Sequence, residues 1–311
     1  MNTQVDTINF TNKSHSFALP ECIVKCSATT FLTSIFTTTL IALGASANAL
    51  QVQINPPNPK LGDTLSAIIN VDSSSSSSVP RVTQGGKTYP AFKIAPNTYR
   101  VFIPTTPLQR SGKRTIRVMA GGEQRNLLVQ VGWRRFSVQR ITLRGNKAGL
   151  RATAYELKRV RELKALKTPQ KFWNGSFLRP SRGRVSTIYG VRRYYNGKFA
   201  KNYYHRGVDY AARSGSPIIA PAAGRVVLVG KVSQGFRVHG NTVGLDHGHG
   251  VVSIFLHLKR INVKEGDIVK AGQLIGGVGS TGASTGPHLH WGLYVNGQAV
   301  DPVPWRFDGV K

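Results

Sequence analysis

The chain has 311 residues, which is enough for two compact domains because single domains typically have roughly 100–200 residues. Its 42 Lys and Arg residues outnumber 13 Asp and Glu residues and give a formal net charge of +29, which favours a polyanion or an anionic surface as the partner. Both cysteines, Cys22 and Cys26, fall within the first 49 residues, so disulfide and thiol chemistry is excluded from the rest of the sequence.

The N-terminal segment has the layout of a secretory signal peptide. An apolar stretch, residues 31–43, follows two lysines and precedes the small-residue site 47–49. It is too short and too polar to span a bilayer, which needs ~20 apolar residues. We therefore expect residues 1–49 to be removed on export, no transmembrane segment to remain, and the mature protein to begin near Leu50. Two basic and two acidic residues are lost together, so the charge stays at +29.

Residues 50–133 read as seven short strands. Their alternating apolar runs are separated by turn-rich pieces such as 55–59, Gly85-Gly86 and Gly121-Gly122. Short strands at this spacing predict a β-sandwich of immunoglobulin-like type. Because the segment carries no cluster of catalytic residue types, we expect it to be an accessory domain with a binding or spacing role.

Residues 134–182 form a basic connector with one predicted helix, residues 151–167, which ends before Thr168-Pro169. Four apolar residues in this helix lie three apart, a pattern that drifts around the helix and gives a broad apolar stripe. We expect such a helix to pack on a neighbouring domain rather than to bind a partner.

Residues 183–305 return to glycine-punctuated β runs, so the predicted fold class is all-β: a sandwich, a connector with one helix, and a second β-rich domain. This last domain also concentrates histidine. It contains seven of the eight histidines of the chain, namely His205, His239, His247, His249, His257, His288 and His290.

Two short motifs in this domain point to a metal. His288-Leu289-His290 lies in a predicted strand, where the period of two puts both imidazoles on one face. His205 and Asp209 form an HxxxD motif. Each motif alone is weak, but two imidazoles and one carboxylate make a three-ligand zinc site with a fourth position open for water. A zinc ion lowers the pKa of its bound water to ~7 and polarises a carbonyl, as amide hydrolysis requires.

Four segments together resemble the lysostaphin-type (LytM-type) zinc endopeptidases, which cleave bacterial peptidoglycan. The resemblance covers residues 183–305, less than half of the chain, and the order and intervals of the motifs match as well as the motifs themselves. The segments are Tyr204-His205-Arg206-Gly207-Val208-Asp209, Phe255-Leu256-His257-Leu258, Gly279-Ser280-Thr281-Gly282 and Thr285-Gly286-Pro287-His288-Leu289-His290-Trp291.

The resemblance implies a role for each residue of the site. His205, Asp209 and His290 would be the zinc ligands, and His257 and His288 would be the catalytic pair. One histidine of the pair would accept the proton of the water, and the other would bind the developing oxyanion or orient the water. The sequence does not assign these two roles between His257 and His288. The family also has a tyrosine upstream of the first ligand that helps to stabilise the oxyanion. Four residues compete for that role: Tyr194, Tyr195, Tyr203 and Tyr204.

Three other histidines are interpreted as structural. His239 lies at a predicted strand end, while His247 and His249 flank a glycine in a predicted hairpin, with His249 at the loop tip. A further segment, 263–273, resembles the hairpins of lipoyl and biotinyl carrier domains. No lysine lies between Lys270 and Lys311 to carry such a group, so we expect a shared architecture only.

The sequence therefore predicts an exported, periplasmic or extracellular zinc metalloendopeptidase that associates with the anionic cell wall and hydrolyses peptide cross-links of peptidoglycan. Relatives use both Gly-Gly bridges and direct D-Ala to diaminopimelate links, and either stays open. The alternative is a catalytically silent relative that binds the wall or activates another hydrolase. Such relatives have lost zinc ligands, whereas all five key positions are filled here. We expect no nucleic-acid partner, since no recognition helix or aromatic-basic motif is present.

Overall fold

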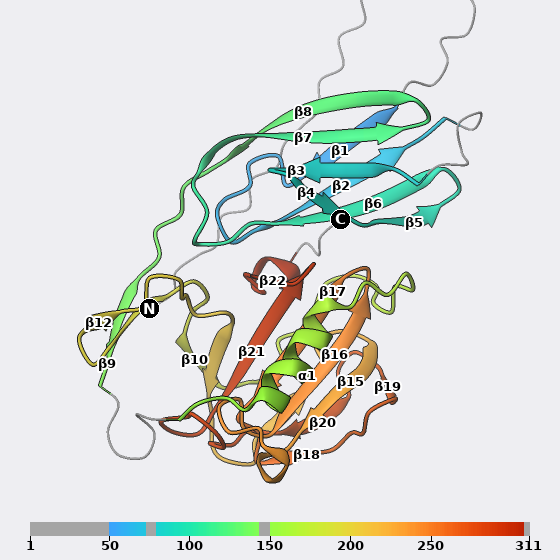
Figure 1. Cartoon of the computed structure of the whole chain (residues 1–311). Coiled ribbons are helices and arrows are strands. Elements are labelled where there is room, and N and C mark those ends of the chain that lie inside the picture. Colours follow the sequence, from blue (N-terminus) through green and yellow to red (C-terminus); the bar gives the residue numbers. More distant parts are fainter. Residues whose placement is uncertain (1–49, 73–78, 143–149, 308–311) are drawn as a thin grey trace, which may run out of the picture. The chain divides into compact units, whose positions relative to one another are not determined.

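The structure, a computed structural model, describes residues 50–72, 79–142 and 150–307 (Figure 1). The predicted signal peptide and both cysteines lie outside these residues. The prediction of an all-β fold with one helix is confirmed for the described part of the chain. None of its helices combines the length and the apolar character that crossing a membrane requires.

The N-terminal β-sandwich consists of eight strands, one more than predicted. These are β1 Gln51–Asn55, β2 Thr64–Asn70, β3 Arg81–Gln84, β4 Lys87–Tyr89, β5 Ala91–Ala95, β6 Thr98–Pro104, β7 Gly112–Ala120 and β8 Glu123–Val131. The antiparallel sheets have the orders β1-β2-β6-β5 and β4-β3-β7-β8. In chain order this corresponds to strands ABED facing C′CFG, so the predicted immunoglobulin-like type is confirmed.

The alternation of side chains builds the core of this sandwich. In β7, Ile116, Val118 and Ala120 are buried while the intervening Arg117 and Met119 are exposed. Successive strand residues point to opposite faces of a sheet, so the alternating pattern buries one face and leaves the other in solvent.

The remaining elements form the connector and the C-terminal domain. The strands are β9 Val138–Ile141, β10 Arg184–Thr187, β11 Arg192–Tyr195, β12 Lys198–Phe199, β13 Val208–Ala211, β14 Pro217–Ile219, β15 Gly224–Gly230, β16 Thr242–Gly248, β17 Val251–Leu256, β18 Arg260–Ile261, β19 Ile268–Val269, β20 Leu274–Gly277, β21 His288–Val295 and β22 Gln298–Val300. The helix α1 is Ala154–Ala165, and two 3₁₀ turns are Val232–Gln234 and Pro304–Arg306.

One antiparallel sheet dominates the C-terminal domain, with the order β10-β13-β21-β17-β16-β15-β19 and β22 paired to β21. The central strands β16 and β17 are buried along their whole length. A strand buried on both faces does not alternate between apolar and polar residues, and β17 accordingly has the nearly continuous apolar run VVSIFL. Smaller sheets, β14-β20-β18 and β12-β11-β9, complete the domain, and the connector strand β9 pairs in parallel with β11.

Helix α1 covers part of this large sheet (Figure 1). It is shorter than the predicted 151–167 because Thr153 caps its N-terminus, and the last predicted turn adopts extended backbone from Leu166. Val160 and Leu163 lie in the core of the C-terminal domain, while Leu157 is 49% exposed. A Cβ atom on Gly244 of β16 would come within 2.8 Å of the Leu163 side chain. The prediction that the helix packs on a domain is therefore confirmed.

Candidate active site

Strand register brings Asp209 and His290 together. Asp209 of β13 lies directly opposite His290 of β21 in an antiparallel pair. Side chains at such paired positions project from the same face, with Cβ atoms about 4.5–5.5 Å apart. The Nδ1 atom of His290 lies 2.8 Å from Oδ1 of Asp209.

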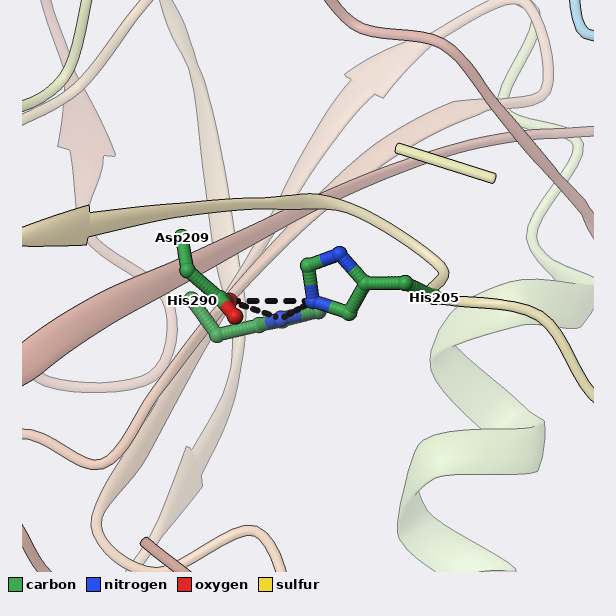
Figure 2. Close-up of side chains that lie close together, drawn as sticks. All are labelled: His205, Asp209 and His290. Atoms are coloured by element: carbon green, nitrogen blue, oxygen red, sulfur yellow. Dashed lines mark hydrogen bonds and ion pairs between the residues drawn. The ribbon is translucent and has the colours of Figure 1, made fainter. Parts of the chain in front are cut away.

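His205 joins this pair from the turn that precedes β13 (Figure 2). Its Nε2 atom lies 3.0 Å from Oδ1 of Asp209 and 3.0 Å from Nδ1 of His290. Nδ1 of His205 donates to the carbonyl oxygen of Ile188 at 2.8 Å, which leaves Nε2 with a free lone pair. All three side chains are buried, and one ligand atom from each lies within 4.8 Å of the others.

Gly207, in the turn between His205 and Asp209, gives the site its close packing. A Cβ atom at this position would lie 2.3 Å from the carbonyl oxygen of Trp291 and 2.8 Å from Nε2 of His290. Any side chain would thus displace β21 or the imidazole of His290. Glycine is required at this position because the backbones of two strands approach closely. The spacing of residues in the sequence does not reveal this approach.

The protonation states of the cluster suit a divalent metal. Burial would raise the pKa of Asp209, but the close approach of the His205 and His290 imidazoles to its carboxylate outweighs burial and holds this pKa well below its usual range. Burial lowers the pKa of His290 to about 4, so its imidazole is neutral at pH 7. Two imidazoles and one carboxylate are a catalytic zinc donor set, with the outward hydrogen bond of His205 as the orienting partner that such ligands commonly have. The residues present therefore fit a zinc ion.

Arg193 of β11 is a charged neighbour that sequence reasoning missed. One of its guanidinium nitrogens lies 3.9 Å from Oδ2 of Asp209, the oxygen that faces away from the two imidazoles, and its side chain is only 14% exposed. Gln139 of β9 accepts from its Nε at 3.1 Å. The hydroxyl groups of Tyr195 and Tyr203 also lie within hydrogen-bond distance of Arg193. Nothing in the sequence distinguishes Arg193 from the adjacent Arg192.

His257 and His288 lie together beside the metal-ligand cluster, with ring centroids 4.9 Å apart. Leu256, the last residue of β17, pairs with His290 of β21. His257 follows Leu256 directly and therefore lies next to this ligand. Nδ1 of His257 donates to the carbonyl oxygen of Thr281 at 2.8 Å, and Nδ1 of His288 donates to that of Gly286 at 2.8 Å. Each ring is thereby held in the tautomer whose Nε2 can accept a proton.

The backbone and electrostatics of His257 are also unusual. Its φ is +66°, in the left-handed region, where a non-glycine residue is rare and often marks a functional site. Burial, together with the neighbouring His288 and His290, lowers its pKa to about 3. The imidazole is therefore neutral at pH 7 and able to accept a proton.

The four tyrosines considered from the sequence separate in the structure. Tyr204 is buried in the core and donates to the carbonyl oxygen of Ala299 at 3.0 Å. Tyr194 lies against Phe199 of β12, with ring centroids 5.0 Å apart and the rings tilted by 43°. Tyr195 and Tyr203 instead contact Arg193, the residue beside Asp209.

The three remaining histidines lie outside the cluster. His247 is fully buried, with Nδ1 donating to the carbonyl oxygen of Ala223 and Nε2 accepting from Ser253. His239 pairs with Glu156. His249 does occupy the turn between β16 and β17, but it is only 2% exposed because its ring lies against Phe92 and Trp173.

Comparison with known proteins gives a family match over most of the C-terminal domain. The model of the family described as Peptidase family M23 matches residues 203–302. These residues include His205, Asp209, His257, His288 and His290.

Individual relatives match the same region. The chain is 44% identical over 99 residues to DD-carboxypeptidase/endopeptidase Mpg of Neisseria meningitidis serogroup B, covering 32% of this chain and 22% of that protein. It is 44% identical over 106 residues to lysostaphin of Staphylococcus staphylolyticus, with the same coverage of 32% and 22%. The chain thus spans about a fifth of the length of these curated relatives.

A solved structure matches much more of the chain. It is a crystal structure from Pseudomonas aeruginosa that is described as a peptidase M23. It is 28% identical, covers 83% of this chain and 96% of its own, and superimposes with a TM-score of 0.58.

Proposed function

Because the chain belongs to peptidase family M23 through residues 203–302, we propose that it is an exported zinc endopeptidase that hydrolyses peptide cross-links of bacterial peptidoglycan. The observation that carries the proposal is the convergence of Nε2 of His205, Oδ1 of Asp209 and Nδ1 of His290 beside a second histidine pair. The matched relatives have names that describe endopeptidases and a carboxypeptidase, which agrees with hydrolysis of peptide bonds.

His205, Asp209 and His290 are the proposed zinc ligands. The bound ion would acidify a water molecule and polarise the scissile carbonyl. His257 and His288 would then share the proton transfer and the stabilisation of negative charge on the carbonyl oxygen, since each has its Nδ1 engaged with a backbone carbonyl and its Nε2 available. Within the described residues no carboxylate other than Asp209 belongs to this cluster, so histidine is the proposed base.

Arg193 and its two tyrosine partners are proposed to support the site from the other side. The guanidinium group holds the outer oxygen of Asp209 and thereby directs Oδ1 toward the two imidazoles. Tyr195 and Tyr203 are the proposed candidates for the tyrosine that assists the oxyanion, since they contact Arg193 while Tyr204 is committed to the core.

The other parts of the chain are proposed to deliver this activity to the wall. Residues 1–49 would be the signal peptide, residues 50–133 an accessory domain, residues 134–182 the connector, and residues 183–305 the peptidase domain. The charge of +29 would hold the mature protein on anionic wall polymers and stem-peptide carboxylates. The periplasm or the extracellular face of the wall is the proposed location.

The test combines metal analysis with digestion of purified cell walls. The purified protein should carry about one zinc per chain and should release cross-linked stem peptides in cleaved form, identified by mass spectrometry. Removal of zinc with a chelator should stop the release, and added zinc should restore it. A folded protein with no bound zinc and no released fragments would instead support the silent, wall-binding alternative.

A further inference from the structure

Glu156 of helix α1 is a buried carboxylate far from the candidate site in sequence. Its side chain is 0% exposed. It lies at the third position of the helix, where it accepts from the backbone N–H of Thr153 at 3.3 Å while Thr153 accepts from its own N–H at 3.0 Å. This reciprocal capping box satisfies two donors at the helix N-terminus.

The same carboxylate also holds a loop of the C-terminal domain. It accepts from the backbone N–H groups of Arg237, Val238 and His239, at 3.1, 3.1 and 2.6 Å. Nδ1 of His239 donates to it as well, at 2.6 Å. Burial alone would raise the pKa of Glu156, but the hydrogen bonds from His239 hold this pKa below its usual value, so the group is charged at neutral pH.

The loop that Glu156 holds is in turn bound to His257. The carbonyl oxygen of His239 accepts from the backbone N–H of His257 at 3.0 Å, which fixes the residue in its left-handed conformation. The backbone N–H of Asn241 donates to Oγ1 of Thr281 at 2.9 Å. The carbonyl oxygen of the same Thr281 accepts from Nδ1 of His257.

The loop 237–241 and the loop 279–286 also lock together through close backbone contact. The N–H of Ala283 donates to the carbonyl oxygen of Val238 at 2.9 Å. A Cβ atom on Gly240 would lie 2.5 Å from the carbonyl oxygen of Thr281, and one on Gly282 would lie 2.5 Å from the backbone nitrogen of Gly240. The loop 279–286 supplies the carbonyl groups that hold both His257 and His288, so a shift of one loop moves both rings.

We propose that Glu156 is a positioning residue for the histidine pair His257 and His288, which makes helix α1 of the connector a part of the catalytic unit. This inference rests on the proposed function, because it assigns Glu156 to the orientation of residues that act on the substrate. A misplacement of about 1 Å at reacting groups can reduce a rate by ~10²-fold. The carboxylate acts only through the two loops and lies outside the zinc cluster.

The test compares three full-length variants, Glu156→Ala, Glu156→Gln and Glu162→Ala. Glu162 lies on the same helix with a side chain that is 52% exposed, and it serves as the matched control. Each variant is measured for zinc content, melting temperature, kcat on a soluble cross-link peptide, and the imidazole NMR signals of His257 and His288.

We expect Glu156→Ala to retain zinc and to lose about 10- to 100-fold in kcat, with shifted signals from both imidazoles. Glu156→Gln keeps one acceptor oxygen for the loop, so it should lose less activity. Glu162→Ala should match the wild type. Should Glu156→Ala fail to fold, Glu156→Gln carries the comparison.

A folded, zinc-loaded Glu156 variant with wild-type kcat and unchanged imidazole signals would overturn the proposal and leave Glu156 a purely structural residue. The imidazole signals also separate this proposal from the proposed function. If the wild type itself shows no hydrolysis, the proposed function fails, while the effect of Glu156 on the orientation of the two rings is still read from the NMR spectra.

Discussion

Asp209 and His290 are cross-strand neighbours on β13 and β21, and the Oδ1 and Nδ1 atoms of their side chains meet at 2.8 Å. Two residues that are 81 positions apart in sequence are thus held together by the hydrogen bonds of a sheet. A site built on paired strands is more rigid than one built on loops, because the ladder fixes both backbones. His288 lies on the same strand and the same face as His290, yet its ring contacts His257 rather than the metal-ligand cluster.

The first prediction separates metal ligand from catalyst within this strand. Replacement of His290 by Ala leaves two protein ligands, so zinc and activity should both be largely lost. Replacement of His288 or His257 by Ala should keep zinc but lower the rate by about 10²–10⁴, the range for proton transfer or oxyanion stabilisation. Metal analysis and peptide hydrolysis check both statements. If His288→Ala abolishes zinc binding while His290→Ala keeps it, the two roles are reversed.

His249 lies in a turn and therefore looks like a suitable control for that experiment, but it cannot serve as one. The ring of His249 is buried against Phe92, so its removal creates a cavity and destabilises the fold. Lys270, an exposed residue of the C-terminal domain, is the better control. Lys270→Ala should retain zinc and the wild-type rate.

The second prediction concerns the close packing at Gly207. Gly207→Ala forces a methyl group against the carbonyl oxygen of Trp291 and the ring of His290, so we expect weaker zinc binding and a lower melting temperature. Gly286→Ala is the matched control, since it lies in the loop before His288 with open space where its Cβ would be. Chelator competition and thermal unfolding measure the difference. Equal zinc affinity in the two variants would contradict the packing argument.

The third prediction concerns Arg193. Its replacement by Ala leaves the outer oxygen of Asp209 without its cation, and partners of metal ligands typically contribute 10- to 100-fold in metal affinity. We expect zinc affinity to fall by about tenfold or more. Arg192→Ala is the control, because Arg192 reaches the carbonyl oxygen of Lys201 instead. The idea fails if both variants bind zinc equally well in competition with a chelator.

The fourth prediction concerns the mature N-terminus. The backbone nitrogen of Leu50 lies 3.0 Å from a carboxylate oxygen of Glu123, so cleavage after Ala49 would place a new ammonium group beside this carboxylate. N-terminal sequencing of the exported protein should therefore begin at Leu50. Glu123→Gln should lower the free energy of unfolding of the mature protein by about 0.2–1 kcal/mol, the range for an exposed ion pair. If the mature protein begins several residues away from Leu50, the new ammonium group does not pair with Glu123, and Glu123→Gln should leave the free energy of unfolding unchanged.

Local patterns predicted much of this molecule correctly. The period of two in β21 placed His288 and His290 on one face, and the apolar stripe of α1 predicted a helix that packs on a domain. The pattern of apolar residues placed the start of that helix three residues too early, because it does not reveal the capping box that Thr153 and Glu156 form.

Contacts between distant segments were not predictable from such patterns. Glu156 binds the loop residue His239, which is 83 residues away in the sequence. No sequence motif surrounds Arg193. It lies beside Asp209 on strand β11, which pairs with the connector strand β9. His249 has the sequence of an exposed turn, and its burial comes from Phe92 of the sandwich, a residue of another sheet.

The last prediction is an acid-sensitive fold that depends on His247. Burial lowers the pKa of this histidine to about 4, whereas the unfolded chain has the usual pKa of about 6.5. Below pH 6.5 the unfolded state therefore binds a proton that the folded state does not, so the free energy of unfolding falls as the pH falls, until the folded state is also protonated near pH 4. One such proton contributes up to about 1.4 kcal/mol per pH unit in that window.

Urea unfolding between pH 4.5 and 7.5, in excess chelator so that zinc release does not contribute, measures this dependence. His247→Gln should be less stable at pH 7, because the hydrogen bonds to Ala223 and Ser253 are altered, but its stability should depend less steeply on pH. The slope separates ionisation from packing, since a packing defect alone shifts the whole curve without tilting it. An unchanged slope in the variant would mean that His247 is not among the groups that titrate on acid unfolding.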